Sequence, residues 1–479
     1  MATKPQQGQP QKQSISSADT RKTIELSKFK GMNTYGSPFA IPDDEFQWLE
    51  ELLPVAGTLQ QPPGPSSTLI TLPAPVMKMW AFTIGDVPYL CCADSANNMH
   101  FVNTLTNAID GGGALSSWEQ CDVTVWQGSI ILVISGNGYQ AFTGTTTAFV
   151  STSVTGNFIT VFSSRVWIGA GRAVAFSAPG SYSDFTIADA GGSFIISDSA
   201  FIGNITALYS ALEQLWIFGQ NAINVLSNVT VVSSTSTTVF SNANLSNVEG
   251  CNWQRAIAPQ LRSLTFANPL GLYMMTGLTP QKISEPLNGM FAQTDPTFNV
   301  HAGVASVFSG QWLCYLVRYT GAQGAGAGSI ILMLDQQTGW GTSRQGGNLT
   351  AIATAWVGGA PVLYGANGPN IVALFSNPST VANWSLSTKL FDMNTASVMK
   401  EMYRIGAFIY QTAGGGSVFT AITENGKQYA APLQTSNGTN FYEASAKAFG
   451  RGIGVYIGGS GYGTVIYSLS IQAEPRSQW

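Results

Sequence analysis

A strand, a polar turn and a second strand are indicated by Val123-Thr124-Val125-Trp126-Gln127-Gly128-Ser129-Ile130-Ile131-Leu132-Val133. The same layout returns at residues 159–168, 205–218, 305–313 and 352–364. Aromatic residues mark strands of this kind about every 46 residues, at Trp80, Trp126, Phe162, Tyr209, Phe266, Phe308, Trp356 and Tyr403. A four-stranded propeller blade takes about 40–50 residues. The pattern therefore predicts an all-β fold, a β-propeller of about six to eight blades.

The rest of the chain is predicted to divide around this propeller. Residues 1–27 are polar and rich in Gln, which predicts a flexible N-terminal arm. Residues 28–68 form an entry segment, and residues 69–479 form the propeller. Loop insertions are expected near residues 227–250, which are rich in Ser, Thr and Asn, and near residues 321–328, which are rich in Gly.

One short helix is predicted in the entry segment. It begins after Pro42, where Asp43 is suited to cap the first turn. The apolar residues that follow have helical spacing, namely Phe46, Leu49, Leu52 and Leu53.

The last strong strand signals lie at residues 454–457 and 465–469. In propellers a terminal strand commonly pairs with strands from the other end of the chain, which removes an open sheet edge. We therefore expect these strands to share a blade with residues 69–82 and to close the propeller.

The composition indicates a component of an assembly. Charged residues make up 10% of the chain, against about 25% in ordinary soluble domains, and the formal net charge is −4. A freely diffusing protein usually carries more charge for solubility, whereas lasting protein contacts can cover a poorly charged surface. Heterologous contacts between copies close rings, so a ring oligomer is expected.

Cysteine usage and hydropathy indicate a protein made in the cytoplasm. The cysteines have no metal-ligand spacing, and we expect buried free thiols at Cys91, Cys92, Cys121, Cys251 and Cys314. Cys91 and Cys92 are adjacent, so they are expected on opposite faces of one strand. No apolar run reaches the roughly 18 residues of a membrane span, and the start has no signal-peptide core.

The sequence predicts no catalytic, cofactor-binding or metal-binding residue, and hence no enzyme and no cofactor. Its two histidines, His100 and His301, each stand alone and are interpreted as structural. Metalloprotease, nucleophile-elbow, phosphate-loop and CxxC motifs are absent. The turn at Asp335-Gln336-Gln337-Thr338-Gly339-Trp340 is interpreted as structural, with the aspartate closing the turn and the tryptophan packing between blades.

An alternative of another class is a secreted propeller that binds or cleaves glycans. Glycoside hydrolysis needs a pair of carboxylates. The acids of the repeats are instead scattered along the chain, at Asp94, Asp110, Asp184, Asp189 and Asp198. The missing signal peptide and unpaired cysteines also speak against this alternative.

Several sequence segments, and the order in which they occur, resemble the tail nozzle proteins of short-tailed bacteriophages. These proteins are also called tail tubular or head–tail stabilisation proteins. The first such segment is Phe29-Lys30-Gly31-Met32-Asn33-Thr34, followed by Ser37-Pro38-Phe39-Ala40-Ile41-Pro42-Asp43. The link Gly57-Thr58-Leu59-Gln60-Gln61-Pro62-Pro63-Gly64 is similar too, although two Gln stand where a basic residue is common. Further similarity lies in Ala256-Ile257-Ala258-Pro259, Gly271-Leu272-Tyr273-Met274-Met275 and the end, Pro475-Arg476-Ser477-Gln478-Trp479.

The resemblance covers roughly residues 28–479. It implies a structural virion protein of the tail, made in the host cytoplasm. Six copies would form the distal nozzle ring that extends the portal–adaptor channel, retains the packaged genome and conducts DNA at ejection. It also implies contacts with the tail adaptor ring and with tail fibres or spikes, and double-stranded DNA passing through the lumen without specific binding.

The basic residues agree with a conduit that does not grip DNA. There are 21 Lys and Arg against 25 Asp and Glu, and the basic residues form no cluster. Duplex binding needs several phosphates to be neutralised at once. We therefore expect no measurable duplex binding at physiological salt. Asp184 and Asp189, acids in a polar loop, are candidates for facing the channel.

Overall fold

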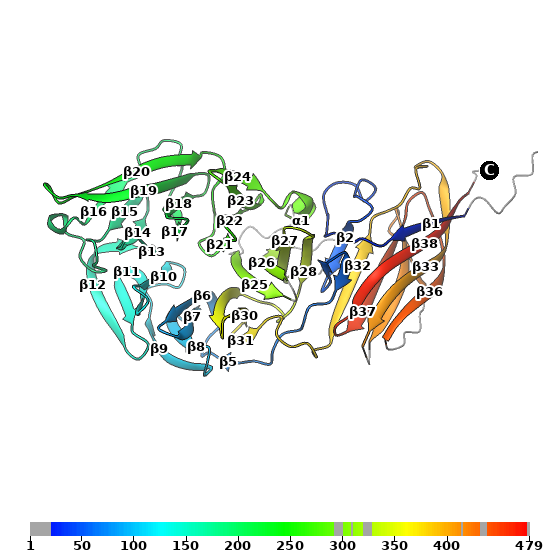
Figure 1. Ribbon diagram of the computed structural model, residues 1–479, viewed down its shortest axis with the longest axis horizontal. Helices are drawn as coiled ribbons and strands as arrows, with labels where there is room; N and C mark the ends of the chain where they lie inside the picture. Colours follow the sequence, from blue (N-terminus) through cyan, green and yellow to red (C-terminus); the bar gives the residue numbers. More distant parts are fainter. Residues whose placement is uncertain are drawn as a thin grey trace, which may run out of the picture.

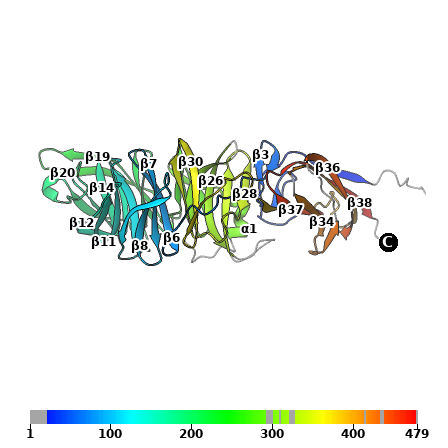
Figure 2. The same ribbon diagram turned by 90° about the horizontal axis from the view of Figure 1, so that it is seen from below.

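The computed structural model describes residues 21–291, 300–307, 310–319, 328–412, 415–431 and 438–476. Over these residues the regular secondary structure is almost all strand, with one short helix, α1 (Asn288–Phe291), and two 3-10 turns, η1 (Ile187–Asp189) and η2 (Glu285–Leu287). The strands form two lobes along the long axis of the molecule (Figure 1). We name them the propeller lobe (residues 70–373) and the sandwich lobe (residues 22–60 and 382–476). Figure 2 shows the two lobes in one line when the molecule is turned by 90°.

The propeller lobe has seven blades, as the sequence predicted within its range of six to eight. Blades one and two contain β6 (Val76–Ile84), β7 (Val87–Asp94), β8 (Asn98–Asn103), β9 (Ala108–Ala114), then β10 (Cys121–Trp126), β11 (Ile130–Phe142) and β12 (Thr147–Gly156). Blades three and four contain β13 (Phe158–Phe162), β14 (Arg165–Ala170), β15 (Ala173–Phe176), β16 (Gly192–Ile195), then β17 (Ile205–Ala211), β18 (Gln214–Gly219), β19 (Ile223–Val232) and β20 (Thr237–Ser246). Blades five and six contain β21 (Ile257–Gln260), β22 (Ser263–Asn268), β23 (Gly271–Thr276), β24 (Thr279–Lys282), then β25 (His301–Val307), β26 (Gly310–Tyr319), β27 (Gly328–Asp335) and β28 (Gly339–Ser343). Blade seven contains β29 (Ala351–Val357), β30 (Ala360–Asn367), β31 (Asn370–Ala373) and β5 (Ile70–Thr71).

The propeller is closed by β5, and the expected closure by the last strands is wrong. Residues of β5 pair with β31 in the register Ile70↔Ile371, so the strand before blade one completes blade seven. The hydroxyl of Thr350 also donates to the carbonyl of Val76 at 2.6 Å, joining blades seven and one. The first strand of each blade lies nearest the axis (Figure 1).

The last strands belong to the sandwich lobe, so the predicted propeller boundary of 69–479 is also wrong. One sheet contains β3 (Leu53–Val55), β4 (Thr58–Gln60), β38 (Val465–Arg476), β33 (Met399–Gln411) and β36 (Gly438–Gly450), with β1 (Lys22–Leu26) beside β38. The second contains β2 (Phe46–Glu50), β32 (Ala382–Thr388), β37 (Ile453–Gly461), β34 (Gly416–Thr423) and β35 (Gln428–Ala431). Strands of both lobes have the same apolar pattern, which does not encode the partner that each strand finds.

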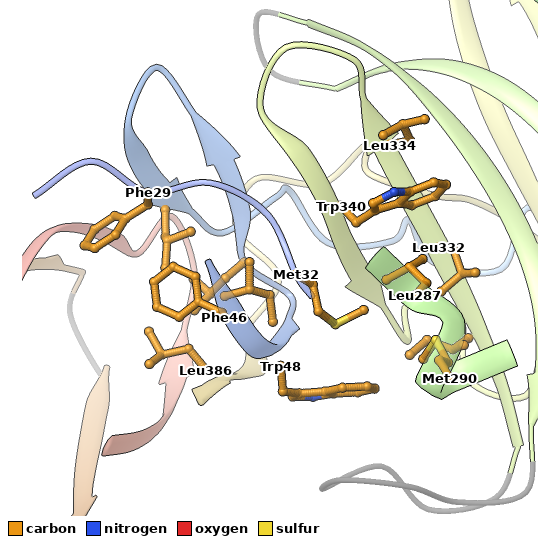
Figure 3. Packing of buried hydrophobic residues seen from close by; sticks show 14 of the residues in the cluster. Phe29, Met32, Phe46, Trp48, Leu287, Met290, Leu332, Leu334, Trp340 and Leu386 are labelled. Atoms are coloured by element: carbon orange, nitrogen blue, oxygen red, sulfur yellow. The ribbon is translucent and has the colours of Figure 1, made fainter. Parts of the chain in front are cut away.

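The two lobes share one apolar core. Met32 and Trp48 of the entry segment point toward Met290 of α1, while Phe46 packs on Leu386 of the sandwich lobe (Figure 3). The second sheet of the sandwich lobe also continues into blade six, because β2 pairs in parallel with β28 at Glu50↔Thr342. The entry segment approaches blade six so closely that a Cβ on Gly31 would lie 2.1 Å from the backbone nitrogen of Trp340. The lobes therefore form one packed unit.

The predicted helix after Pro42 is wrong. Residues Phe46–Glu50 form β2, and the chain then breaks at Glu51, whose φ is 52°, before β3. Phe46, Trp48 and Leu49 are all buried, because both faces of β2 are covered. Burial on two faces removes the alternation that would have distinguished a strand from a helix.

The arm and the insertions also differ from the expectation. Within the predicted arm 1–27, Lys22–Leu26 form β1, which pairs with β38 from Lys22↔Ala473 to Leu26↔Leu469. Residues 1–20 lie outside the described part of the chain. The segment 227–250 is mostly a continuation of the β19–β20 hairpin of blade four rather than a loop. Of the segment 321–328, residue 328 alone is described, as the start of β27.

Candidate functional site

A cavity of about 520 Å³ lies at the axis of the propeller lobe. Its walls come from the innermost strands of blades one, four, five, six and seven, with the segment before β21. The walls are mainly apolar and include Trp80, Phe82, Ile257 and Trp356. Ligand sites in proteins are typically concave, apolar and of about 300–1,000 Å³, with a few converging polar groups. The cavity has the size of such a site.

Four polar side chains line this cavity, namely Tyr209, Arg255, Gln311 and Thr354. The Nε of Arg255 is buried and has no hydrogen-bond partner among the described residues, and the same holds for the hydroxyl of Thr354. The guanidinium of Arg255 lies over the ring of Trp80, 5.3 Å from its centroid. Burial lowers the pKa of Arg255, an effect that the negative charge of Asp122 opposes. The positively charged guanidinium of Arg255, which has an unused N–H donor, therefore faces a mainly apolar cavity.

Lys78 and Asp122 are the other charged groups buried near Arg255, and both are fully engaged in holding the blades. Nζ of Lys78 donates to the carbonyl of Glu119 at 2.7 Å and to Oε1 of Gln254 at 2.8 Å. Asp122 accepts from Nε1 of Trp80 at 3.1 Å and from the backbone N–H of Ile159 at 3.0 Å. These bonds join blade one to blade two, blade two to blade three and blade one to the segment entering blade five.

His301 is buried at the start of β25, and neither ring nitrogen has a partner among the described residues. Burial lowers the pKa of His301 well below its ordinary value, and the charges of Arg255 and Lys78 lower it further. The imidazole is therefore neutral at pH 7. His100, in contrast, is paired: its Nε2 lies 2.8 Å from Oδ2 of Asp94.

The scattered acids hold local turns rather than forming a catalytic pair. Oδ1 of Asp94 accepts the N–H groups of Ala96 and Asn98 in the β7–β8 turn. The other acids bond to nearby polar groups: Asp110 to Tyr89 and Asn103, Asp184 and Asp189 to Thr186, and Asp198 to Asn244. In the described ranges no group of three His, Cys, Asp or Glu is placed to hold a metal ion.

One pair of carboxylates was missed by the sequence analysis. Glu401 and Glu474 lie directly opposite each other on β33 and β38. The hydroxyl of Tyr403 lies 2.9 Å from a carboxylate oxygen of each, and Nε of Arg476 donates to Glu401 at 2.6 Å. Like charges directly opposite are unfavourable unless they are neutralised. Arg476 pairs with Glu401, and Nε of Arg21 lies 3.8 Å from Glu474, so two arginines offset the two carboxylates, which fits a structural role. Only the strand register brings the two carboxylates together.

The cysteines and the Asp335 turn agree with their structural interpretation. All five cysteines are buried free thiols, and Cys91 and Cys92 lie in different core clusters on opposite faces of β7. Oδ1 of Asp335 accepts the N–H of Gln337 at 2.8 Å and closes the turn. Nε1 of Trp340 donates to the carbonyl of Ile283 at 3.2 Å, which connects blade six to the end of blade five.

A second candidate surface is the solvent side of the six-stranded sheet of the sandwich lobe. Aromatic side chains there are between 36% and 57% exposed, and we name them the outer aromatic face: Phe408, Tyr410, Phe441, Phe449 and Tyr467. Phe408 lies opposite Phe441 on the neighbouring strand, and its ring centroid is 5.4 Å from that of Tyr467. The inward side chains of β33 and β36 alternate with these and belong to the core. The solvent face of this sheet therefore carries exposed aromatics among polar side chains, such as Glu443, Ser445 and Lys447 of β36.

No family model and no curated protein matches the chain. The WD40 repeats of RRP9 are similar in structure, with 8% identity and a TM-score of 0.44 over 66% of this chain and 99% of that chain. U3-55K is similar with 7% identity and a TM-score of 0.42 over 64% of this chain and 97% of that chain.

The β-propeller fold is shown by the sheets of the propeller lobe. At such low identities and TM-scores the likenesses say nothing about what this chain binds or does. A search of the described helices for a membrane span finds none that is long and apolar enough.

Proposed function

We propose that this chain is a structural subunit of the tail nozzle of a short-tailed bacteriophage, and that six copies form a ring around the path of the DNA. The proposal rests on the sequence resemblance and is supported by one structural observation, the outer aromatic face. It includes contacts with the tail adaptor ring and with tail fibres or spikes.

The outer aromatic face is unusual for a protein that acts alone. Monomeric soluble proteins rarely expose large contiguous apolar patches, and such patches commonly mark protein interaction sites. Aromatic residues are also enriched where protein interfaces are buried. Between these aromatics the charges of Arg404 and Glu443 are paired at 3.1 Å, and the exposed Lys447 adds one positive charge. A neighbouring protein with an apolar and weakly acidic surface fits this face.

The propeller axis does not provide the DNA path. Its cavity of about 520 Å³ has small-molecule size. A DNA duplex does not fit, since its major groove alone is about 12 Å wide. In the proposed assembly the lumen therefore lies between copies, and each chain contributes one sector of the wall.

The test is the number of copies in isolated tails and in the purified protein, measured by native mass spectrometry and by electron microscopy. We expect six copies in a ring with an axial hole. Subunits that remain monomeric alone are expected to form the ring when the adaptor is added. Tails without a six-copy ring of this chain would contradict the proposal.

The double variant Phe408→Ser, Phe441→Ser tests the surface that supports it. Both side chains are exposed, so the melting temperature of the subunit should stay nearly unchanged while ring formation is lost. The matched control is Phe149→Ser, an aromatic that is 70% exposed on β12 of the propeller lobe. If the double variant and the wild type form rings equally well, the outer aromatic face no longer supports the proposed nozzle role.

A further inference from the structure

We infer that the axial cavity of the propeller lobe binds a small carboxylate with an apolar body, and that Arg255 holds the carboxylate. This inference is independent of the proposed nozzle role, because it concerns the interior of a single subunit.

The first argument is the unused donor capacity of Arg255. Nε of this residue is buried without a partner among the described residues, and its recorded side-chain contact is the face of Trp80. A guanidinium carries five N–H donors and no acceptor. Burying a charge without hydrogen bonds is costly, so buried arginines are normally paired. An acceptor within the cavity would satisfy this group.

The second argument is the charge balance around the cavity. Lys78 and Asp122 carry opposite charges and are bonded to other groups of the propeller lobe. His301 is neutral at pH 7, for the reasons of burial given above. Among the described residues, Asp122 is the one carboxylate that acts on both Lys78 and Arg255, so this buried cluster holds one positive charge in excess. A ligand with a single negative charge balances it.

The third argument is the nature of the walls. Trp356 and Leu261 line the cavity and are 61% and 73% exposed, so the cavity is open to solvent beside them. The side chains of Phe82 and Ile257 continue the apolar wall. Tyr209 and Thr354 add two hydroxyl groups to the same cavity. An apolar body packs against these walls, and the hydroxyls are in place to bond a second oxygen.

A carboxylate fits this arrangement better than a phosphate. Arginine binds a planar carboxylate through two parallel hydrogen bonds. A phosphate carries close to two negative charges at neutral pH, whereas the guanidinium of Arg255 supplies one positive charge. The single excess positive charge of the cluster therefore favours a carboxylate, which carries one negative charge, over a phosphate.

The test uses the full purified chain and isothermal titration calorimetry with two probes of nearly equal shape, indole-3-acetate and its neutral amide. We expect the acid to bind at least about tenfold more tightly than the amide, since hydrogen bonds to a charged group contribute that much. Equal affinity for the two probes, or no binding of either at millimolar concentration, would overturn the inference. Inorganic phosphate is the third probe, and phosphate binding tighter than that of the acid would overturn the choice of a carboxylate.

The variant Arg255→Met should remove the preference for the acid over the amide. Its melting temperature should change little, because Lys78 still faces the carboxylate of Asp122 and the new side chain is apolar and of similar length. The matched control is Arg262→Met, an exposed arginine in the β21–β22 turn, which should keep the preference. Arg255→Lys serves as a second variant, which keeps the charge but not the fork and should show a reduced preference. Unchanged preference in both Arg255 variants would place the carboxylate elsewhere and contradict the inference.

Discussion

The hydroxyl of Ser343 donates a hydrogen bond to Oε1 of Glu51 at 2.9 Å, which joins blade six to the entry segment of the sandwich lobe. The same carboxyl group accepts the backbone N–H of Arg344 at 2.6 Å and Nε2 of Gln345 at 3.3 Å. Glu51 is buried. Burial raises its pKa to about 7, although the hydrogen bonds from Arg344, Ser343 and Gln345 oppose the rise. A titrating group thus lies inside the joint between the lobes.

The first prediction is that this joint loses stability as the pH rises. The pKa of Glu51 is raised from 4.5 to about 7 in the folded protein, so between these values the folded state binds more protons than the unfolded chain. The contribution of Glu51 is therefore fully present below about pH 4.5 and is lost as the pH rises through 7. Between pH 5 and pH 8 the free energy of unfolding should fall by about 2–3 kcal/mol from this group.

Glu51→Gln isolates this effect, because it keeps an oxygen acceptor and cannot ionise. Urea unfolding at pH 5 and pH 8 should show a smaller fall in the variant than in the wild type. Ser343→Ala removes a donor that favours the ionised form, so its pH dependence should move to higher pH. Identical pH profiles for Glu51→Gln and the wild type would contradict the assignment.

The second prediction concerns the closure of the propeller by β5. Leu72 follows β5, is 3% exposed and packs in the cluster that joins blades seven and one. Truncating a buried leucine costs about 2–5 kcal/mol, so Leu72→Ala should lower the free energy of unfolding by that amount. The exposed neighbour Thr71 is the control, and Thr71→Ala should cost less than about 1 kcal/mol. Equal small effects of both changes would speak against closure at this strand.

Much of the propeller could be predicted because its inner strands repeat one pattern. Trp80, Trp126, Phe162, Tyr209 and Trp356 each lie on the first strand of a blade, and Phe308 lies outside the described residues. Two markers behave differently: Phe266 lies on the second strand of blade five, and Tyr403 lies in the sandwich lobe. The spacing of aromatic residues predicts how many strands there are, but it does not predict which sheet each strand joins. That depends on pairing between distant segments, such as β1 with β38.

The axial site could not be predicted, because no local motif marks it. Arg255 lies in a segment without strand structure before β21, and Trp80 lies far away in the sequence on β6. Ring closure alone brings them together. The outer aromatic face had a weak local signal, the alternation of large and small residues along Phe441–Phe449. Strand alternation shows that two faces exist, and it does not show that the second face is left to solvent.

The third prediction concerns Asp122, which connects three blades near the axis. Replacing it by Ala leaves Nε1 of Trp80 and the N–H groups of Val123 and Ile159 without their acceptor. Leaving buried donors unpaired is costly, so Asp122→Ala should lower the free energy of unfolding by about 3–5 kcal/mol. The control is Asp198→Ala, which removes a half-buried carboxylate bonded to Asn244 and to the backbone N–H of Ala200 and should cost about 1 kcal/mol. Both values follow from urea unfolding at constant pH.

The fourth prediction is that the isolated protein does not bind duplex DNA at about 150 mM salt. Several of its cations already have partners, as in the pairs Lys30 with Asp44 at 2.8 Å and Lys389 with Asp43 at 2.8 Å. Lys78 and Arg165 are buried, so they are not available to phosphates. Fluorescence anisotropy with a labelled duplex should show no binding. Tight, salt-sensitive and sequence-dependent binding would identify a DNA-recognition protein and contradict the nozzle proposal.

The fifth prediction concerns the loop of blade three that contains Asp184 and Asp189. If this loop lines the lumen of the assembled tail, lysines in it would contact passing phosphates, and DNA ejection should slow without loss of assembly. The structure sharpens the design, because Oδ1 of Asp184 accepts the N–H of Thr186 at 2.8 Å and Oδ2 of Asp189 accepts its hydroxyl at 3.0 Å. A lysine therefore adds a charge and also removes a turn contact. Asp184→Asn, Asp189→Asn is the control, since it removes the charges and keeps an oxygen acceptor at each position. Slower ejection with the lysines and normal ejection with the asparagines would indicate contact with DNA. Equal slowing in both variants would show that the turn is damaged, and unchanged ejection in both would place the loop away from the lumen.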